Sequence, residues 1–251
     1  MRTFSIAITG KGGTGKTTVS ALLVRALVDA GETPVLAVDA DPNSNLNEAL
    51  GIELHETLGY MREGTFRESI PPGMTRNAYI ELCFRRAIVE EKGFDLVAMG
   101  RPEGSGCYCF ANDLLKTCMT LLGRDYRFIV IDNEAGMEHL SRGTIGIPDI
   151  LIIVSDPGVR GMKTAARIHD LARSLGLSSV PVLLVLNRFK GSTADSLIPE
   201  PALFIPEDPA IEKAELSGMP VGSLKEGSPA RVAVERLAGI IRSMARERQR
   251  T

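Results

Sequence analysis

A glycine-rich segment near the amino terminus limits what this chain can fold into. Residues 10–17 read GKGGTGKT and fit the phosphate-binding pattern G-x-x-x-x-G-K-[ST]. The apolar residues 4–8 precede the segment and predict a strand, and residues 19–27 follow it with a helix-forming pattern. Glycines allow backbone N–H groups to converge on phosphate oxygens, and the start of the helix adds its positive dipole end. This order of strand, loop and helix predicts a site for a nucleoside triphosphate.

The side chains of this loop have expected roles at the nucleotide. Lys16 is expected to neutralise phosphate charge, and the Thr17 hydroxyl is expected to ligate Mg²⁺. The other loop residues expected to bind the nucleotide are Gly12, Gly13, Thr14, Gly15 and Thr18. The alternative is a glycine turn that only connects a strand to a helix, and the Lys–Thr pair disfavours it.

Short apolar runs along the chain indicate the fold class. Seven of them predict strands, at residues 3–9, 34–38, 95–99, 128–131, 150–154, 181–186 and 202–205. Helical patterns lie between or after them, at residues 56–63, 77–91, 112–122, 163–175 and 229–249. This alternation predicts an α/β protein with a doubly wound, mostly parallel sheet flanked by helices. No linker divides the chain, so residues 1–251 are expected to form a single domain.

Composition narrows the possible partners. The net charge is −2, which offers no general attraction to nucleic acid or anionic lipid, and no apolar run reaches the length of a bilayer span. The chain enters its first predicted strand at once, so no signal peptide is expected and the expected location is cytoplasmic. In that compartment the four cysteines are expected to be free thiols or metal ligands rather than disulfides.

Acidic residues follow two of the predicted strands, where the carboxyl edge of a parallel sheet holds the phosphates. Asp41 is the candidate for orienting water in line with the γ-phosphate, and Asp39 is a candidate near Mg²⁺. An Asx turn without a catalytic role is the alternative for both. Asp132 ends an apolar strand and is expected to hold a Mg²⁺-bound water. Gly136 follows it and could donate its N–H toward the γ-phosphate.

Two cysteines, Cys107 and Cys109, stand two residues apart behind a glycine-rich turn. An extended backbone would turn both thiols to one side. A soft tetrahedral metal site requires four ligands, and a symmetric dimer would supply four thiolates from two copies. Buried or loop thiols without a metal are the alternative. Cys83 and Cys118 are expected to serve packing only.

The loop at residues 10–17 carries an additional lysine, Lys11, and resembles the deviant Walker A loop of the MinD/ParA/nitrogenase-iron-protein class of P-loop NTPases. That resemblance implies a homodimer closed by ATP, in which Lys11 reaches the partner's nucleotide and contributes to catalysis. A solvated surface lysine is the alternative. The D-P-x-x-N run at Asp41 is similar to the switch I segment of this class. Asn187 is similar to its base-reading asparagine, and Pro206 and Glu207 to its adenine loop.

Three features together resemble the nickel-insertion ATPases of the CooC type. They are the loop with two lysines, the C-Y-C at residues 107–109 and the D-N-E-A-G run at residues 132–136. The resemblance implies an ATP-hydrolysing dimer with ATP or ADP and Mg²⁺ in each copy, and Ni²⁺ or Zn²⁺ at Cys107 and Cys109. The implied partner is apo carbon monoxide dehydrogenase or acetyl-CoA synthase, with no nucleic acid and no membrane.

Two other functions remain open from the sequence. Two cysteines per subunit could bridge an iron–sulfur cluster, as in a carrier or reductase like the nitrogenase iron protein. The run at residues 132–136 has no cysteine, which argues against that function. A MinD/ParA-type positioning ATPase is the other alternative, and the net charge of −2 disfavours it.

Overall fold

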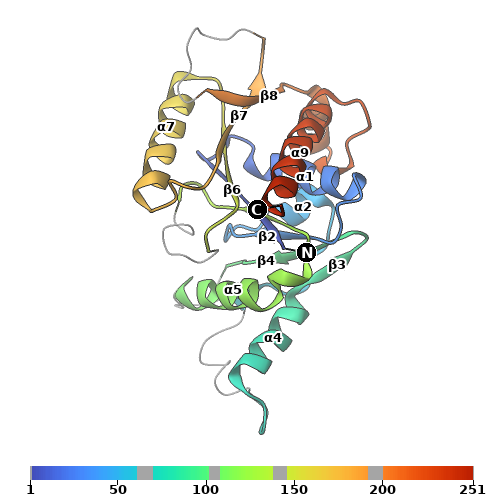
Figure 1. Ribbon diagram of the computed structural model, residues 1–251. Coiled ribbons are helices and arrows are strands. Elements are labelled where there is room, and N and C mark those ends of the chain that lie inside the picture. Colours follow the sequence, from blue (N-terminus) through green and yellow to red (C-terminus); the bar gives the residue numbers. More distant parts are fainter. Residues whose placement is uncertain (1, 61–69, 102–107, 138–145, 192–199, 251) are drawn as a thin grey trace.

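The computed structural model describes residues 2–60, 70–101, 108–137, 146–191 and 200–250, and its centre is an eight-stranded sheet (Figure 1). The strands are β1 (Phe4–Gly10), β2 (Val35–Asp39), β3 (Val89–Glu91), β4 (Phe94–Ala98), β5 (Phe128–Asp132), β6 (Ile150–Ser155), β7 (Val182–Phe189) and β8 (Pro201–Pro206). Their order across the sheet is β3-β4-β2-β5-β1-β6-β7-β8, and every neighbouring pair is parallel except β3 with β4. The predicted doubly wound α/β fold and its seven strands are confirmed.

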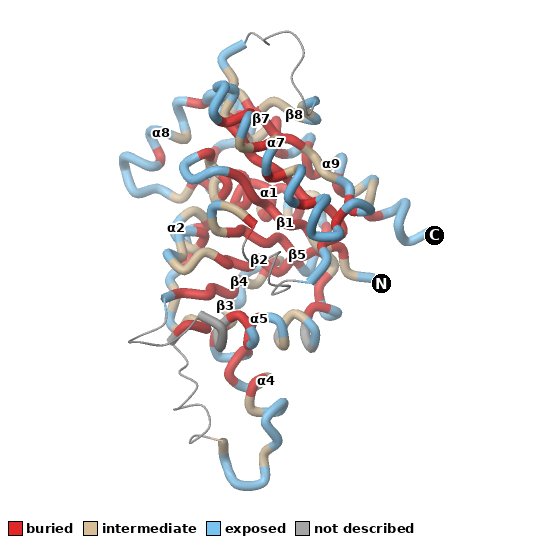
Figure 2. Tube along the Cα trace, turned by 90° about the vertical axis from the view of Figure 1, so that its left-hand side faces the viewer, coloured by how far each residue is buried: buried red, intermediate tan, exposed pale blue. Residues whose placement is uncertain are grey.

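The helices cover both faces of this sheet. They are α1 (Lys16–Asp29), α2 (Leu46–Leu50), α4 (Arg76–Ala87), α5 (Tyr108–Leu122), α7 (Val159–Ser174), α8 (Pro209–Leu216) and α9 (Pro229–Arg248), with 3₁₀ turns η1 (Leu58–Tyr60), η2 (Gly123–Asp125) and η3 (Val221–Ser223). One hydrophobic cluster joins α1, α2 and α9 to one face, and a second joins α4, α5 and α7 to the other. Figure 2 shows that the central strands are buried over most of their length.

Side-chain alternation explains the two clusters. Ile6 and Ile8 of β1 belong to the first cluster, whereas Ala7 between them belongs to the second. Successive residues of a strand point to opposite faces, so a strand covered on both sides must be apolar throughout. All three residues are fully buried, which is why the sequence reads as a continuous apolar run.

Two predicted helices were wrong in extent. The helix predicted at residues 77–91 ends at Ala87, and Val89–Glu91 forms the antiparallel strand β3. The β-branched residues Ile88 and Val89 favour an extended backbone, and Gly93 at φ 89° closes the hairpin to β4. In place of the helix predicted at residues 56–63, the described part contains only η1, and residues 61–69 lie outside it.

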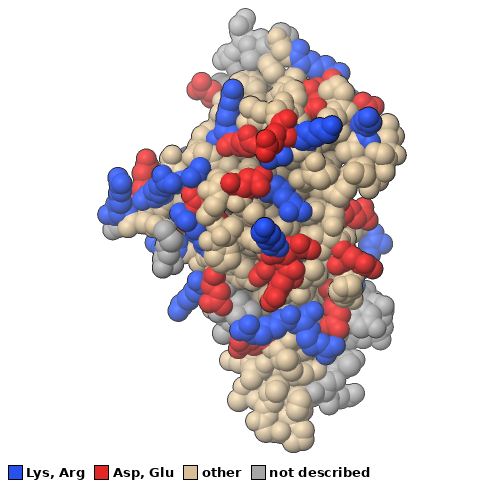
Figure 3. All heavy atoms as spheres, turned by 90° about the vertical axis from the view of Figure 1, so that its right-hand side faces the viewer, with Lys and Arg blue, Asp and Glu red and all other residues tan. Residues whose placement is uncertain are grey.

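The carboxy-terminal helix α9, predicted at residues 229–249, packs on α1 and β8. Its buried face consists of small and branched apolar residues: Ala230, Ala233, Val234, Leu237, Ala238, Ile241 and Ala245. Charged side chains of both signs are interspersed on this side of the molecule (Figure 3). Across the described ranges, every helix is too short or too polar to cross a bilayer.

Asp208 joins the beginnings of two helices. Its carboxylate accepts hydrogen bonds from Ala210 N (2.9 Å) in α8 and from Ala230 N (3.1 Å) in α9, and Ser228 Oγ also donates to it. Burial raises the pKa of Asp208, but these hydrogen bonds outweigh burial and hold the pKa below its ordinary value of 3.8.

Replacing Asp208 with alanine is expected to lower the free energy of unfolding by about 2 kcal/mol, because two helix starts lose an acceptor. A depressed pKa stabilises the fold above the unfolded-state pKa, and this stabilisation is lost as the pH falls through the folded-state value. Urea unfolding of the nucleotide-free protein should therefore show a smaller difference between wild type and variant below pH ~4. Thr75→Ala is the control, because Thr75 caps only α4 through Ala78 N. An Asp208 effect no larger than this control would contradict the prediction.

Candidate functional site

The expected site residues meet at the carboxyl ends of four strands. Strand β1 leads into the glycine loop, β2 ends at Asp39, β5 ends at Asp132, and Asn187 lies near the end of β7. The register places Asp39 opposite Asp132 on adjacent strands. A parallel sheet brings such strand ends to one edge, and ligands bind there in α/β folds.

The glycine loop requires its glycines at specific positions. Gly15 has φ 90°, and a Cβ there would lie 2.3 Å from Asn187 Nδ2. Gly10 lies so close to β6 that a Cβ would be 2.1 Å from the carbonyl oxygen of Val154. Larger residues would therefore push the loop away from the strand ends that flank it.

The two lysines of the loop differ in exposure. Lys16 is buried, and its Nζ donates to the carbonyl oxygen of Lys11 at 3.4 Å, so it bends back over the loop. The Thr14 hydroxyl donates to the same oxygen at 2.9 Å. The side chain of Lys11 is exposed. Lys16 is thus positioned to reach a bound phosphate, whereas Lys11 is free to extend outward.

Two buried carboxylates lie beside the first turn of α1. Thr17 Oγ1 donates to Asp132 Oδ2 at 2.6 Å, and Ser20 Oγ donates to Asp132 Oδ1 at 3.1 Å. Asp39 accepts from Asp41 N (3.1 Å) and Leu46 N (2.8 Å). Both acids are at most 1% exposed.

These carboxylates hold more negative charge than their neighbours neutralise. Burial, then the charge of Asp132, raises the pKa of Asp39 to about 7. Burial also raises the pKa of Asp132 to about 6, although Thr17, Ser20 and Lys16 oppose that rise. A cation would offset this repulsion, and Mg²⁺ commonly takes one or two carboxylates together with substrate phosphates. Thr17, Asp39 and Asp132 fit that requirement.

Asp41 follows β2 and forms a tight turn. Its Oδ1 accepts from Asn43 N (2.8 Å) and Asn43 Nδ2 (2.9 Å), and its backbone oxygen accepts from Ser44 N (3.0 Å). The carboxylate therefore has the Asx-turn geometry that the sequence left open. The side chain is half-buried at the same edge as Lys16.

Gly136 is hydrogen-bonded to the end of β1 and the start of the glycine loop. Its N–H donates to the carbonyl oxygen of Gly10 at 3.4 Å, and the Thr9 hydroxyl donates to its carbonyl oxygen. Gly136 has φ 111°, which a larger residue seldom adopts. In this conformation its N–H is used within the protein, so contact with a γ-phosphate requires this segment to move.

A cavity of about 540 Å³ lies beside the glycine loop, where a base could bind. It brings together the three expected residues Asn187, Pro206 and Glu207 with Thr18 of α1. Asn187 also braces the loop, because its Nδ2 donates to Thr14 O at 2.9 Å and its Oδ1 accepts from Arg188 N at 3.0 Å. One amide hydrogen and one lone pair of Asn187 remain for a base.

Sequence reasoning missed Arg188, which lines the same cavity. Its Nη1 donates to the carbonyl oxygen of Gly13 at 3.0 Å, so β7 holds the glycine loop at a second point. Arg188 has φ 56°, an unfavourable conformation for an arginine, and such strain is concentrated at functional sites. The position of Arg188 directly after Asn187 was only a weak sequence signal for a role at the site. A sequence does not reveal a positive φ at a residue other than glycine.

The cysteine pair is only partly covered by the structure. Cys107 lies outside the described residues, and Cys109 belongs to the first turn of α5. The backbone at Cys109 is therefore helical rather than extended. Cys83 is buried in the core, and burial raises the pKa of its thiol, consistent with the predicted packing role. Within the described ranges, no three His, Cys, Asp or Glu side chains form a metal cluster.

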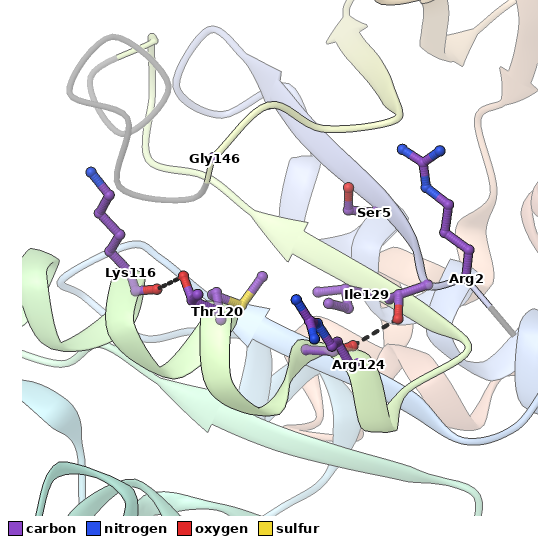
Figure 4. Close-up of a pocket in the computed structure, with 10 residues that line it drawn as sticks. Arg2, Ser5, Lys116, Thr120, Arg124, Ile129 and Gly146 are labelled. Carbon is purple, nitrogen blue, oxygen red and sulfur yellow. Dashed lines mark hydrogen bonds between the residues drawn. The ribbon is translucent and has the colours of Figure 1, made fainter. Parts of the chain in front are cut away.

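A separate cavity of about 570 Å³ opens near the amino ends of β1 and β5 (Figure 4). Arg2, Lys116 and Arg124 contribute positive charge to its lining. The Thr120 hydroxyl donates to the carbonyl oxygen of Lys116, and the Thr3 hydroxyl donates to that of Gly123, so these groups already have partners. The residues expected at the nucleotide are absent from its described lining.

Comparisons with known proteins agree with this geometry. The family described as the CobQ/CobB/MinD/ParA nucleotide binding domain matches residues 5–221. An uncharacterized ATP-binding protein of Methanocaldococcus jannaschii, MJ0685, is 41% identical over 93% of this chain and 96% of its own length. The carbon monoxide dehydrogenase accessory protein CooC of Rhodospirillum rubrum is 38% identical over 70% of this chain and 71% of its own.

A solved structure is similar over nearly the whole chain. The septum site-determining protein MinD of Pyrococcus horikoshii, complexed with Mg-ADP, has a TM-score of 0.72 and is 24% identical. The match covers 97% of each chain. At this identity the likeness shows a shared fold.

Proposed function

Because the chain belongs to the CobQ/CobB/MinD/ParA family of nucleotide-binding domains, we propose that it is an ATP-driven metallochaperone for nickel. It is an ATPase of the MinD/ParA class. In the proposed function, two copies close around ATP and deliver nickel to carbon monoxide dehydrogenase or acetyl-CoA synthase in the cytoplasm. The observation that carries the proposal is the identity with the CooC accessory protein in a chain that also has a Cys-x-Cys pair after β4.

Hydrolysis is assigned to residues at the carboxyl edge of the sheet. Lys16 neutralises charge on the β- and γ-phosphates, while backbone N–H groups of the glycine loop bind the phosphate oxygens. Asp41 orients a water in line with the γ-phosphorus, and bond formation to that water releases ADP. Mg²⁺ bound near Thr17, Asp39 and Asp132 would supply further neutralisation of the phosphates. The solved MinD relative contains Mg-ADP in the same fold, which supports this ligand set.

The base is assigned to the cavity beside β7 and β8. Asn187 has one amide hydrogen and one lone pair available for an adenine edge, while Pro206 and Glu207 cover the base. The contact of Arg188 with Gly13 keeps the phosphate loop and the base cavity in a fixed relation. In this proposal, nucleotide affinity depends on both the glycine loop and the base cavity.

The dimer brings the metal ligands together. Lys11 is exposed at the edge that carries the phosphates, which supports its proposed reach toward the nucleotide of a second copy. Cys107 and Cys109 from each copy would supply the four thiolates that a soft metal such as Ni²⁺ or Zn²⁺ prefers. Nickel is the cargo in this proposal, and hydrolysis relaxes the dimer and releases it.

The decisive experiment measures nickel and ATP binding of Cys107→Ala/Cys109→Ala by calorimetry under anaerobic conditions. The variant is expected to lose tight nickel binding, because both soft ligands of each copy are absent, and to keep wild-type ATP affinity. Cys83→Ala is the matched control, because this thiol is buried in the core away from the phosphate residues. Unchanged nickel stoichiometry in the double variant would refute the proposed metal site.

A positioning ATPase related to MinD is the second candidate, favoured by the structural likeness to MinD. Membrane positioning through α9 would require its apolar face to be free. That face is buried against α1 and β8, with Leu237 and Ile241 fully covered. Sedimentation with anionic liposomes in the presence of ATP would favour this candidate over the metallochaperone.

A further inference from the structure

The cavity of Figure 4 lies at the edge of the sheet opposite the nucleotide site. Its lining includes Thr3 and Ser5 at the start of β1 and Ile129 near the start of β5. Both strands end at the nucleotide site, at Gly10 and Asp132, so the length of the strands separates the two sites. Small-molecule sites commonly have volumes of about 300–1,000 Å³. The volume of about 570 Å³ is therefore sufficient for a ligand of its own.

The hydroxyl groups of the lining already donate within the protein. Thr3 Oγ1 donates to Gly123 O at 2.8 Å, and Thr120 Oγ1 donates to Lys116 O at 2.9 Å. Ser5 Oγ donates to the carboxylate of Asp149 at 3.0 Å. The side-chain donors that remain in the described lining are those of its basic residues.

Three basic side chains from separate segments surround the cavity. Arg2 precedes β1, Lys116 belongs to α5 and Arg124 to η2, and all three are exposed. Figure 4 shows Lys116 and Arg2 on opposite sides, with Arg124 and Ile129 between them. The described lining contains no acidic side chain, although the whole chain has a net charge of −2. Among the described residues, none of the three has an acidic partner.

The wall between these cations is apolar. Ile129 is 3% exposed and belongs to the hydrophobic cluster beneath α5, and Met119 packs against the same cluster. A cleft with charges of one sign and low-dielectric walls concentrates the field and attracts ions of the opposite sign. A small inorganic anion would leave the apolar wall in contact with water, whereas an organic body would cover it. The lining is thus complementary to a ligand that is both apolar and negatively charged.

We propose that this cavity binds an organic anion, with its apolar body against Met119 and Ile129. Its carboxylate or phosphate groups lie beside the three cations. The proposal is independent of the nickel function, because none of these residues is assigned to the nucleotide or to the metal. The organic anion and the nucleotide occupy opposite edges of the sheet, so one chain binds both at once.

The test titrates the full chain, saturated with Mg-ADP, with the fluorescent anion anilinonaphthalene sulfonate (ANS), whose sulfonate stands in for a carboxylate or phosphate. One ANS should bind per chain, and sodium chloride should weaken its binding. Exchanging Arg2, Lys116 or Arg124 for glutamine should each weaken it about 1.5–5-fold, the range for an exposed ion pair, and the triple variant should lose at least about tenfold. Arg160→Gln, on the exposed side of α7, is the matched control and should bind ANS as wild type does.

Other probes identify the ligand chemistry. Octanoate and octyl phosphate compete with ANS, and the stronger competitor identifies the preferred acidic group, whereas displacement by neither would overturn the proposal. Equal affinity for the neutral analogue N-phenyl-1-naphthylamine, or an unchanged ANS affinity in the triple variant, would also overturn it. Methyl NMR of the wild type locates the probe independently of the variants. The Cδ1 signal of Ile129, assigned with Ile129→Val, should shift when ANS is added, and an unmoved signal would refute the site.

Discussion

Replacing Asp41 by asparagine is expected to lower the turnover number of ATP hydrolysis by about 10²–10⁴, the usual contribution of a positioned acid–base group. Asparagine keeps an Oδ1 that can accept both hydrogen bonds from Asn43, so the turn should persist. What is lost is the negative charge that is proposed to orient water. Phosphate release measures the turnover number, and fluorescent ATP titration should show an affinity close to wild type.

Asp156→Asn is a matched control for that change. Asp156 follows β6, and its Oδ1 accepts from Gly158 N at 2.9 Å, which is the same local hydrogen bond at the end of another strand of the sheet. Its substitution should leave hydrolysis near the wild-type rate. If Asp41→Asn were equally harmless, Asp41 would have a structural role in the turn and the hydrolytic role would be abandoned.

Replacing Glu32 by alanine is expected to cost about 3–5 kcal/mol of unfolding free energy, as when one partner of a buried ion pair is removed. Glu32 is only 3% exposed in the turn after α1. Its Oε1 accepts from Arg242 Nε at 2.7 Å, and Arg127 lies against its Oε2. Without the carboxylate, the two arginines keep their positive charges in a partly desolvated environment. The ion pairs that connect α9 to the segments before β2 and β5 are also lost. Urea unfolding at neutral pH measures the loss.

Glu235→Ala controls for the removal of a carboxylate from α9. Glu235 is exposed and pairs with Arg231 Nε at 3.0 Å, so its loss should cost no more than about 1 kcal/mol. If Glu32→Ala lost no more unfolding free energy than Glu235→Ala, water would already screen the charges of Glu32 and its arginines. The ion pairs of Glu32 would then behave like surface ion pairs.

The parallel strands could be predicted because burial on both faces requires continuous apolar runs, as at residues 150–154. The glycine loop could be predicted because its spacing is fixed by phosphate geometry. Strand β3 was missed because only one of its three residues is apolar, and a short edge strand leaves no such run. Gly93 is a turn signal after this strand, but the helical pattern predicted at residues 77–91 covered the strand itself.

Contacts between distant segments set the limit of sequence reasoning at the site. Asp39 and Asp132 were assigned to one edge because the carboxyl ends of parallel strands lie at the same edge of a sheet. The bond from Arg101 to Asn43 depends on the path of loops after β2 and β4. Arg101 belongs to no motif, and Asn43 occupies a variable position of the D-P-x-x-N run. The strained backbone of Ser44 and Arg188 is imposed by tertiary contacts and leaves no trace in residue type.

The outermost strands of the sheet limit how copies of this protein can assemble. Strand β3 presents exposed Glu90 and Glu91 over three residues, and β8 begins and ends with a proline and pairs irregularly with β7. Carboxylates repel an identical neighbour, and proline lacks the N–H that a further strand would need. Edge-to-edge pairing that would extend the β-sheet from one copy to the next is therefore opposed at both edge strands. Concentrated protein should resist fibre formation, and copies are left to associate through loops and helices.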